Sequence, residues 1–265
     1  ADWATELCAD GGVILVLAGP GNNGGDAFDA ARRLRAAFFD VVLVFAGDPD
    51  RLPANAAAAC KHFLADGGLI RHDIPAQRRW ALIIDGLFGI GITRDITGLH
   101  ADLIERAIAL ADRDGCPLLA LDCPSGLDAD TGVVRGAVIR ASHTLSFIAA
   151  KPGLFTGDGP DYCGNCRVAA LDLDAEAIAP AAGRLVGGDA FAAYLTPRWR
   201  NSHKGSYGNA GILGGAPGMT GAALLASRAA LRLGSGRVYV ALLDAQAPAL
   251  DPCQPELMLR RPDAL

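Results

Sequence analysis

The stretch that decides the fold is residues 13–34, which read VILVLAGPGNNGGDAFDAARRL. Its first part, residues 13–17, is continuously apolar, as is typical of a central parallel strand that is covered on both faces. A glycine-rich turn follows, and glycines let the backbone turn sharply and expose N–H groups at the start of a helix. The stretch therefore predicts a strand, a loop and an amphipathic helix from about Ala27.

Residues 19–24 match the dinucleotide fingerprint G-x-G-x-x-G, and the acidic residue Asp48 follows the next apolar run, residues 41–45. This match alone is a weak signal. Asp26 stands at the predicted helix entrance, where an ordinary site of this kind would seat a pyrophosphate, although Asp26 as a simple helix cap is an equal alternative. Two asparagines and a carboxylate among four glycines favour a cation or a polyhydroxylated ligand over bare phosphate.

Apolar runs and amphipathic segments then alternate along the chain with short links between them. This alternation predicts an α/β fold with a Rossmann-like, doubly wound, mostly parallel sheet, whose ligand site lies beyond the carboxyl ends of the strands. The expected strands are residues 41–45, 81–84, 118–121, 144–148 and 168–171, and the expected helices are residues 54–65 and 99–112.

Three carboxylates follow the best strands of this sheet: Asp26, Asp85 and Asp122. We expect them to converge at one edge, where they would repel each other unless a cation or hydrogen-bond donors compensated. The pattern indicates a metal site, a general acid/base, or both. Ser125 lacks the G-x-S-x-G spacing of a nucleophile and is interpreted as a ligand or positioning group. Lys151 could meet an anionic part of a ligand or be a solvated loop residue, and the sequence favours neither.

Composition bounds the function classes. The chain has 265 residues, 51% of them hydrophobic, and a net charge of -5, which argues against a nucleic-acid partner. No apolar run approaches the roughly 20 residues of a membrane span. Seven scattered cysteines favour reduced thiols and a cytoplasmic protein, and the single C-x-x-C spacing, Cys163 to Cys166, is a poor candidate for a metal or redox centre.

A second unit is expected behind a hinge at residues 179–183. We place the domains at residues 1–180 and 187–265. The second unit begins with a strand over 210–213, a glycine loop, a helix over 222–233 and a strand over 238–242. The chain as given starts near the end of a helix over residues 1–9 and ends before a second sheet is complete, so we expect it to lack parts of both domains.

Three motifs together carry a family resemblance. They are GPGNNGGD (19–26), DGLFGIG (85–91) and DCPSGLDADTG (122–132), and in this order and spacing they resemble the NAD(P)H-hydrate epimerase domain. Residues 203–240 are similar to the opening of the ADP- or ATP-dependent NAD(P)H-hydrate dehydratase domain that bacteria fuse behind it, which implies an incomplete ribokinase-like α/β segment. ADP or ATP would serve the dehydratase part only where that part is complete, and we expect no ADP-dependent dehydration without its late catalytic motif.

The resemblance implies a repair enzyme that interconverts the R and S hydrates of NADH and NADPH. It implies one potassium ion in each epimerase site, on Asn23, Asp85 and Ser125, and Asp122 as the catalytic acid/base beside the hydrated ring. A homo-oligomer is expected. The implied substrate-binding residues are Asn22, Asn23, Gly24, Gly25, Asp26, Gly89, Ile90, Gly91, Ile92, Thr93, Arg94, Asp95 and Asp122.

Two departures from the family pattern fall in the expected site: Ala27 replaces the usual glycine and Ile90 the usual threonine. Two other functions stay open. An NAD-dependent dehydrogenase would use the literal fingerprint and Asp48, and a non-catalytic nucleotide-binding or scaffold module would keep the fold without the reaction. The complete set of Asp26, Asp85, Asp122 and Ser125 favours the enzyme.

Overall fold

The decisive stretch folds into strand β1 (Val13–Ala18), a turn and helix α2 (Asn22–Ala36). The helix therefore begins at Asn22 and not at Ala27. The two glycines that looked like loop lie inside it, where neighbours come too close for a side chain: a Cβ on Gly24 would lie 1.9 Å from the carbonyl oxygen of Gly19. The prediction of Asp26 as an entrance or capping residue was wrong, because the N-cap is Gly21.

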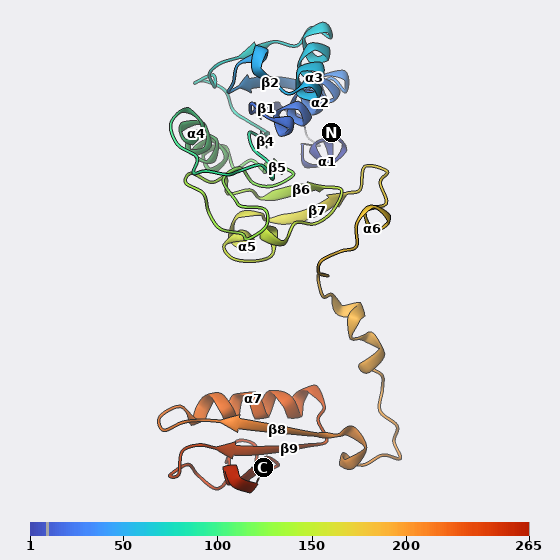
Figure 1. Ribbon diagram of the computed structural model, residues 1–265, viewed down its shortest axis with the longest axis vertical. Coiled ribbons are helices and arrows are strands. Elements are labelled where there is room, and N and C mark those ends of the chain that lie inside the picture. Colours follow the sequence, from blue (N-terminus) through green and yellow to red (C-terminus); the bar gives the residue numbers. More distant parts are fainter. Residues whose placement is uncertain (9–10, 265) are drawn as a thin grey trace. The chain divides into compact units, whose positions relative to one another are not determined.

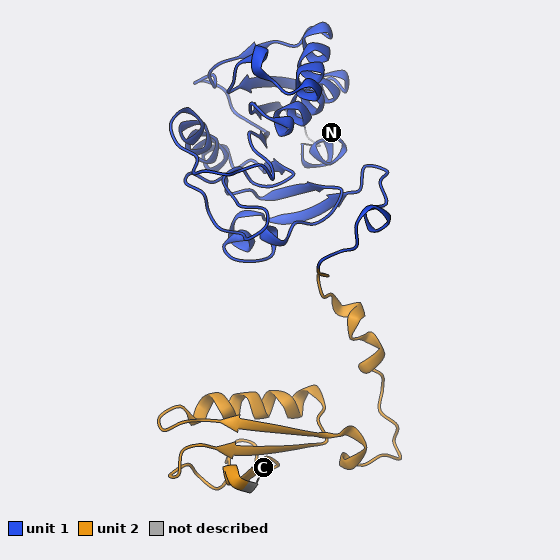
Figure 2. Cartoon of the chain, viewed as in Figure 1, with its two compact units in different colours: residues 1–182 blue, residues 183–265 orange. Residues whose placement is uncertain are grey.

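The structure is a computed structural model that describes residues 1–8 and 11–264. It divides into two units, Ala1–Ala182 and Gly183–Leu265 (Figure 2). Every residue from 176 to 206 is exposed, and the short helices in this segment are α6 (Ala175–Ile178), η3 (Gly188–Ala190), η4 (Ala192–Tyr194) and the start of η5 (Lys204–Tyr207).

The first unit is built on a seven-stranded sheet in the order β3-β2-β1-β4-β5-β6-β7, with every neighbouring pair parallel. This order is that of a doubly wound sheet that reverses direction next to β1, so the predicted Rossmann-like fold is confirmed. The remaining strands are β2 (Asp40–Phe45), β3 (Ile70–Arg71), β4 (Leu82–Gly86), β5 (Leu118–Leu121), β6 (His143–Phe147) and β7 (Asn165–Ala169).

Helices cover both faces of this sheet (Figure 1). On one face α1 (Asp2–Leu7), α2 and α3 (Ala54–Ala65) pack on alternate strand residues such as Val16, and on the other α4 (Leu99–Asp114) packs on residues such as Leu15. Successive side chains of a strand point to opposite faces, which explains why β1 is apolar throughout. Helix α1 ends at Leu7; Ala9, the last residue of the expected helix, lies outside the described residues. Short helices η1 (Pro49–Arg51), η2 (Pro152–Leu154) and α5 (Gly159–Tyr162) occupy the loops.

The second unit holds a three-stranded parallel sheet in the order β10-β9-β8. Helix α7 (Thr220–Leu233) packs on the side of the sheet that presents Val238 and Val240. The strands are β8 (Asn209–Gly214), β9 (Arg237–Leu242) and β10 (Met258–Arg260), and η6 (Pro262–Ala264) follows. Strand β10 had no counterpart among the sequence expectations. That this segment is ribokinase-like stays a prediction.

Candidate functional site

The innermost group of the site is Asp85, which is completely buried. It is a residue of β4 itself and does not follow the strand, so the expected strand end at residue 84 was too early. Its Oδ1 accepts hydrogen bonds from the Ser125 hydroxyl at 2.7 Å and the Leu87 N–H at 3.1 Å, and its Oδ2 accepts from the Ser125 N–H at 2.8 Å. Burial raises the pKa of Asp85 to about 6, although these donors partly offset the loss of hydration.

The hydroxyl of Ser125 links Asp85 to the loop after β4. Besides donating to Asp85, the hydroxyl oxygen accepts a hydrogen bond from the Phe88 N–H at 2.8 Å and lies 3.2 Å from the Phe88 carbonyl oxygen. Ser125 is fully buried. Its predicted role as a positioning or ligand group therefore agrees with a position among oxygen atoms and away from solvent, where a nucleophile would have no access to substrate.

Asn23 brings α2 to the same place. Its Nδ2 donates to the carbonyl oxygen of Leu121, the last residue of β5, at 3.2 Å. Its Oδ1 is buried and has no hydrogen-bond partner among the described residues. A buried acceptor without a partner costs on the order of 1–3 kcal/mol, so this oxygen marks a position where a further group, such as a cation, would be stabilised.

Asp122 follows β5 directly and has a left-handed backbone, with φ at 64°. Such a conformation is uncommon for a residue other than glycine and costs on the order of 1–3 kcal/mol. Its Oδ1 lies 2.5 Å from the Lys151 ammonium and accepts from the Phe147 N–H at 3.3 Å. Its Oδ2 points toward Gly89, because a Cβ added to that glycine would lie 3.1 Å from this oxygen.

Asp26 is exposed on α2 near this carboxylate. Its pKa is raised to about 6, first because neighbouring chain removes part of its hydration, then because of the negative charges of Asp122 and Asp29. The structure thus places Asp26 close enough to Asp122 for their charges to interact. Asp85 is hydrogen-bonded to Ser125, which lies in the loop that follows Asp122. The predicted convergence is therefore seen for Asp26 and Asp122, while Asp85 is linked to this loop through Ser125.

The loop expected to surround the nucleotide is open to solvent. Gly91, Thr93, Arg94 and Asp95 are exposed, and so is Ile90, at 65%. The loop is anchored at its end, where Ile96 donates to the Arg135 carbonyl at 3.0 Å and accepts from the Ala137 N–H at 3.1 Å.

The two departures from the family pattern differ in position. Ile90 is exposed, at the loop surface. Ala27 is fully buried in the core that α2 shares with the sheet, so the expectation that it lines the site was wrong. Its Cβ fills the space above Gly86, where an added Cβ would come within 2.5 Å of it.

Asp48 does not behave as the ribose ligand of a dehydrogenase. Its side chain caps η1 by accepting a hydrogen bond from the Asp50 N–H at 3.1 Å. The acidic residue after β2 therefore has a structural role as a helix cap, which weakens the main sequence argument for the dehydrogenase alternative.

Lys151 is the site residue that sequence reasoning left undecided. Its Nζ pairs with Asp122 and donates to the Phe147 carbonyl at 2.6 Å, and its side chain is 16% exposed. The solvated-loop interpretation was wrong. The sequence signal for an ordered lysine was the following Pro152 and Gly153, which restrict the backbone next to Lys151. The contact between Lys151 and Asp122 joins residues that are far apart in the sequence, so local sequence patterns do not predict it.

Of the cysteine pair, Cys163 is buried and Cys166 is half-buried. Cys163 donates to the Leu154 carbonyl at 3.1 Å, and burial raises the pKa of Cys166 to about 12. Within residues 1–8 and 11–264, no cluster of three or more His, Cys, Asp or Glu side chains is suited to hold a metal ion. A cation site lined by amide, hydroxyl and carboxylate oxygens is a different arrangement.

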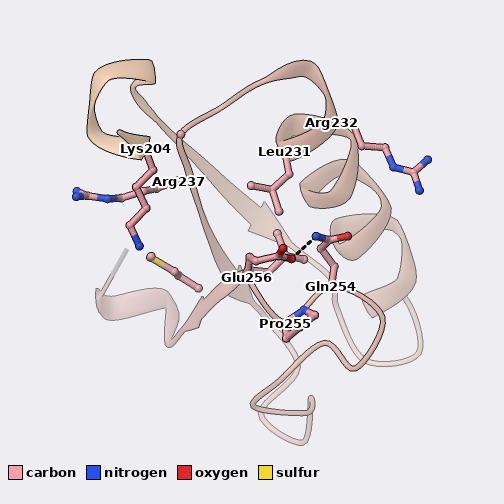
Figure 3. Close-up of a pocket in the computed structure, with 10 residues that line it drawn as sticks. Lys204, Leu231, Arg232, Arg237, Gln254, Pro255 and Glu256 are labelled. Carbon is pink, nitrogen blue, oxygen red and sulfur yellow. Dashed lines mark hydrogen bonds between the residues drawn. The ribbon is translucent and has the colours of Figure 1, made fainter. Parts of the chain in front are cut away.

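A cavity of about 590 Å³ lies in the second unit (Figure 3). Lys204, Arg232, Arg237 and Glu256 are among its lining residues. The lining contains none of the residues predicted for the site. The polar edge of the first sheet remains the better functional candidate, because several buried oxygen atoms converge there.

Together these features define the class: a doubly wound α/β protein with a polar site at the carboxyl edge of its parallel sheet. Residues 1–153 match the family model described as YjeF-related protein N-terminus, and the chain belongs to this family.

Similar proteins extend this result. The chain is 38% identical over 251 residues to the bifunctional NAD(P)H-hydrate repair enzyme of Escherichia coli, covering 92% of this chain and 47% of that protein. It is 36% identical over 249 residues to the corresponding enzyme of Coxiella burnetii, with 92% and 50% covered. It is also 40% identical over 187 residues to the NAD(P)H-hydrate epimerase of Bordetella bronchiseptica, with 69% and 80% covered. The chain thus spans about half the length of the bifunctional relatives. In the described part of the chain no helix has the length and apolar character needed to cross a membrane.

Proposed function

We propose that the first unit is an NAD(P)H-hydrate epimerase, which interconverts the R and S hydrates of NADH and NADPH. The observation that carries the proposal is the Asp122 carboxylate. One of its oxygens is held by Lys151 and Phe147, and the other points toward Gly89, where the absence of a side chain lets a ligand approach. The similarity to an NAD(P)H-hydrate epimerase over 69% of this chain supports the same conclusion.

In this proposal the substrate lies between the start of α2 and the loop after β4. Residues Asn22 to Asp26 line one side, and Gly89 to Asp95 wrap the nucleotide on the other. The loop is exposed to solvent, and its anchored end at Ile96 fixes where the loop returns to the body of the unit. That the protein acts as a homo-oligomer stays a prediction.

Asp122 acts as the acid/base. It exchanges a proton with the hydrated nicotinamide ring while the ring hydroxyl leaves and returns, or while the ring opens and closes. Either route inverts the carbon that carries the hydroxyl and leaves the composition of the hydrate unchanged. A positioned carboxylate contributes roughly 10²–10⁴-fold to such a reaction.

A potassium ion fits the oxygen atoms around Asp85. The unpartnered Oδ1 of Asn23, the Asp85 carboxylate and the Ser125 hydroxyl are all buried and have the hard-oxygen chemistry that such an ion binds. When bound, the ion would supply positive charge that offsets carboxylate repulsion and stabilises the ionised form of Asp85. The residues of the chain hold the substrate and move the proton.

The test is an exchange assay that starts from the purified S hydrate of NADH. We expect the R form to appear faster than its spontaneous rate in potassium buffer, and more slowly when sodium replaces potassium. Asp122→Asn should lower kcat roughly 10²–10⁴-fold while the hydrate still binds. Asp130→Asn, an exposed carboxylate in the same loop, is the matched control and should keep full activity.

Two outcomes would redirect the assignment. Near-normal turnover by Asp122→Asn would remove Asp122 from the reaction. No acceleration by the wild type, together with tight hydrate binding, would favour a non-catalytic nucleotide-binding module. A dehydrogenase would instead be stabilised by NAD in a thermal melt as strongly as by the hydrate.

A further inference from the structure

A strained turn follows β6 and directs the chain back toward the site. Ile148 has a left-handed backbone with φ at 67°, which is a rare conformation for a β-branched residue. The turn is fixed by hydrogen bonds from the Ile148 N–H to the Ala169 carbonyl at 2.7 Å and from the Ser146 hydroxyl to the Ala149 carbonyl at 2.9 Å. Strain of this kind persists where the surroundings enforce it, and it is concentrated at functional sites.

The turn leads to Lys151, whose backbone is also fixed by the residues that follow it. Pro152 opens η2 directly after it, and the Gly153 N–H donates to the Ala129 carbonyl at 2.7 Å. A Cβ on Gly153 would lie 2.2 Å from the Asp128 carbonyl oxygen, so this segment packs directly on the loop that follows Asp122. The lysine side chain therefore starts from a rigid base.

From this base the ammonium group of Lys151 binds two atoms of neighbouring strand ends. It lies 2.5 Å from Asp122 Oδ1 and 2.6 Å from the Phe147 carbonyl oxygen, while the Phe147 N–H donates to the same Oδ1. The two side chains are only 16% and 13% exposed. Strands β5 and β6 are direct neighbours in the sheet, and each is followed by a left-handed residue, Asp122 and Ile148.

An ordinary salt bridge does not account for this arrangement. The pair is mostly buried, and each of the two strands that it joins is followed by a left-handed residue other than glycine, a conformation that costs free energy. What the arrangement achieves is orientation. Because Lys151 and Phe147 both occupy Oδ1, the carboxylate has only Oδ2 to offer, and that oxygen points toward Gly89.

We propose that Lys151 is a positioning residue of the epimerase reaction, which holds Asp122 so that Oδ2 alone meets the substrate. This inference rests on the proposed function. On ring opening, Oδ2 takes the proton of the ring hydroxyl and passes it to the ring nitrogen, as the carbon–nitrogen bond breaks and the hydroxyl oxygen becomes a carbonyl. On closure the same steps run in reverse on either face of the carbonyl, so the carboxylate ends each cycle unchanged. Lys151 keeps its protons throughout and compensates the negative charge of Asp122, beside which Asp26 carries a second carboxylate.

Lys151→Met tests the inference, because methionine keeps most of the side-chain length and removes the charge and the donors. We expect kcat to fall roughly 10²-fold, the effect of misplacing a reacting group by about 1 Å, with KM changed less than about threefold. Lys61→Met, an exposed lysine of α3, is the matched control and should behave as the wild type. Lys151→Ala should recover part of its kcat when propylamine is added, which a purely structural loss would not do.

A crystal structure of Lys151→Met gives a readout that does not depend on turnover. The Asp122 carboxylate should rotate away from the Phe147 N–H. Unchanged kcat in Lys151→Met, a change in KM alone, or a carboxylate that keeps its position would each overturn the inference and leave the proposed function standing. If the variant melts too low to assay, Lys151→Arg, which retains the charge, should fold and lose kcat in part, and full activity there would also overturn it. A wild type without epimerase activity would refute the proposed function, and this inference with it.

Discussion

The sheet of the first unit is covered by helices on both faces, whereas α7 packs on one face of the sheet in the second unit and leaves Leu213 of β8 61% exposed. Leu225 and Leu233 of α7 are also exposed, at 65% and 82%. In the first unit, by contrast, residues 14–18 of β1 are fully buried.

The difference shows what a site of this kind requires. Asp85 and Asn23 have fixed orientations because they lie on β4 and α2, whose apolar residues are packed in the core, and Ser125 is held by its hydrogen bonds to Asp85. The left-handed backbone of Asp122 is held between strand β5 and the residues that follow β6. The second unit has a glycine-rich loop between β8 and α7 too, but its surroundings bury far less of each element. Rigidity from two-sided packing therefore distinguishes the two units more than their similar strand, loop and helix order does.

The largest expected effect is on stability, and it contrasts a buried position of the first unit with an exposed position of the second. Phe28 of α2 is fully buried, with its ring 5.4 Å from that of Phe45 and 5.9 Å from that of Phe63. Phe28→Ala should lower the free energy of unfolding of the first unit by about 3–5 kcal/mol. Leu225→Ala in α7 should cost no more than about 0.5 kcal/mol. Urea denaturation measures both, and an equal cost at the two positions would show that Leu225 is packed in solution.

An intermediate effect is a pH response that differs between the units. The pKa of Asp85 is raised from 3.8 to about 6, which means that the folded state binds the proton more tightly than the unfolded state does. The resulting contribution to the free energy of unfolding is complete below pH 4 and is lost as the pH rises through about 6. In buffer without potassium the first unit should lose on the order of 2–3 kcal/mol across this window. Asp251 of the second unit has a lowered pKa, mainly because Arg228 donates to it, so its contribution is lost only as the pH falls below about 4.

Urea melts at pH 4.5 and pH 7 measure this response. Fluorescence of the buried Trp3 and Trp80 would report the first unit. Asp85→Asn should reduce the slope and leave the part due to Asp26, whose pKa is also raised to about 6. A first unit that becomes more stable toward pH 7 without potassium would contradict the account given for Asp85.

The smallest expected effect concerns Asp48. Its carboxylate caps the short helix η1 at the surface, so Asp48→Asn, which keeps an acceptor oxygen, should change stability by less than about 0.5 kcal/mol. Hydrate turnover should stay at the wild-type rate. The exchange assay and a thermal melt check both results, and a marked rise in KM would return Asp48 to the ligand site.

Much of the first unit was predictable, because buried parallel strands are apolar on both faces. β5 and α3 have the predicted bounds. The start of α2 was not predictable, since Gly24 and Gly25 are typical of loops, and only contacts made after folding explain glycine inside a helix. Strand β10 has only three residues and pairs with β9, which lies well before it in the sequence. Such a short strand has no recognisable hydrophobic periodicity.

For the site too, the sequence predicted what depends on strand topology and did not predict what depends on packing. Placement of Asp85 and Asp122 at one edge came from topology alone, because parallel strands end on the same side. The Asp122 to Lys151 pair required knowledge of a left-handed turn at Ile148, and no local propensity predicts a β-branched residue there. The unpartnered oxygen of Asn23 is likewise a property of the packed structure, since it depends on which groups do not reach it.

The spread of the site along the chain also sets the order in which it is finished during synthesis. Asn23, Asp85 and Asp122 leave the ribosome in turn, each with its own strand or helix, while Lys151 emerges last of the four. Until then Asp122 stands near Asp26 without a compensating cation from the chain. A nascent chain that ends before β6 lacks Lys151 and so cannot orient Asp122, and the proposed epimerase site is completed only when the first unit is nearly complete.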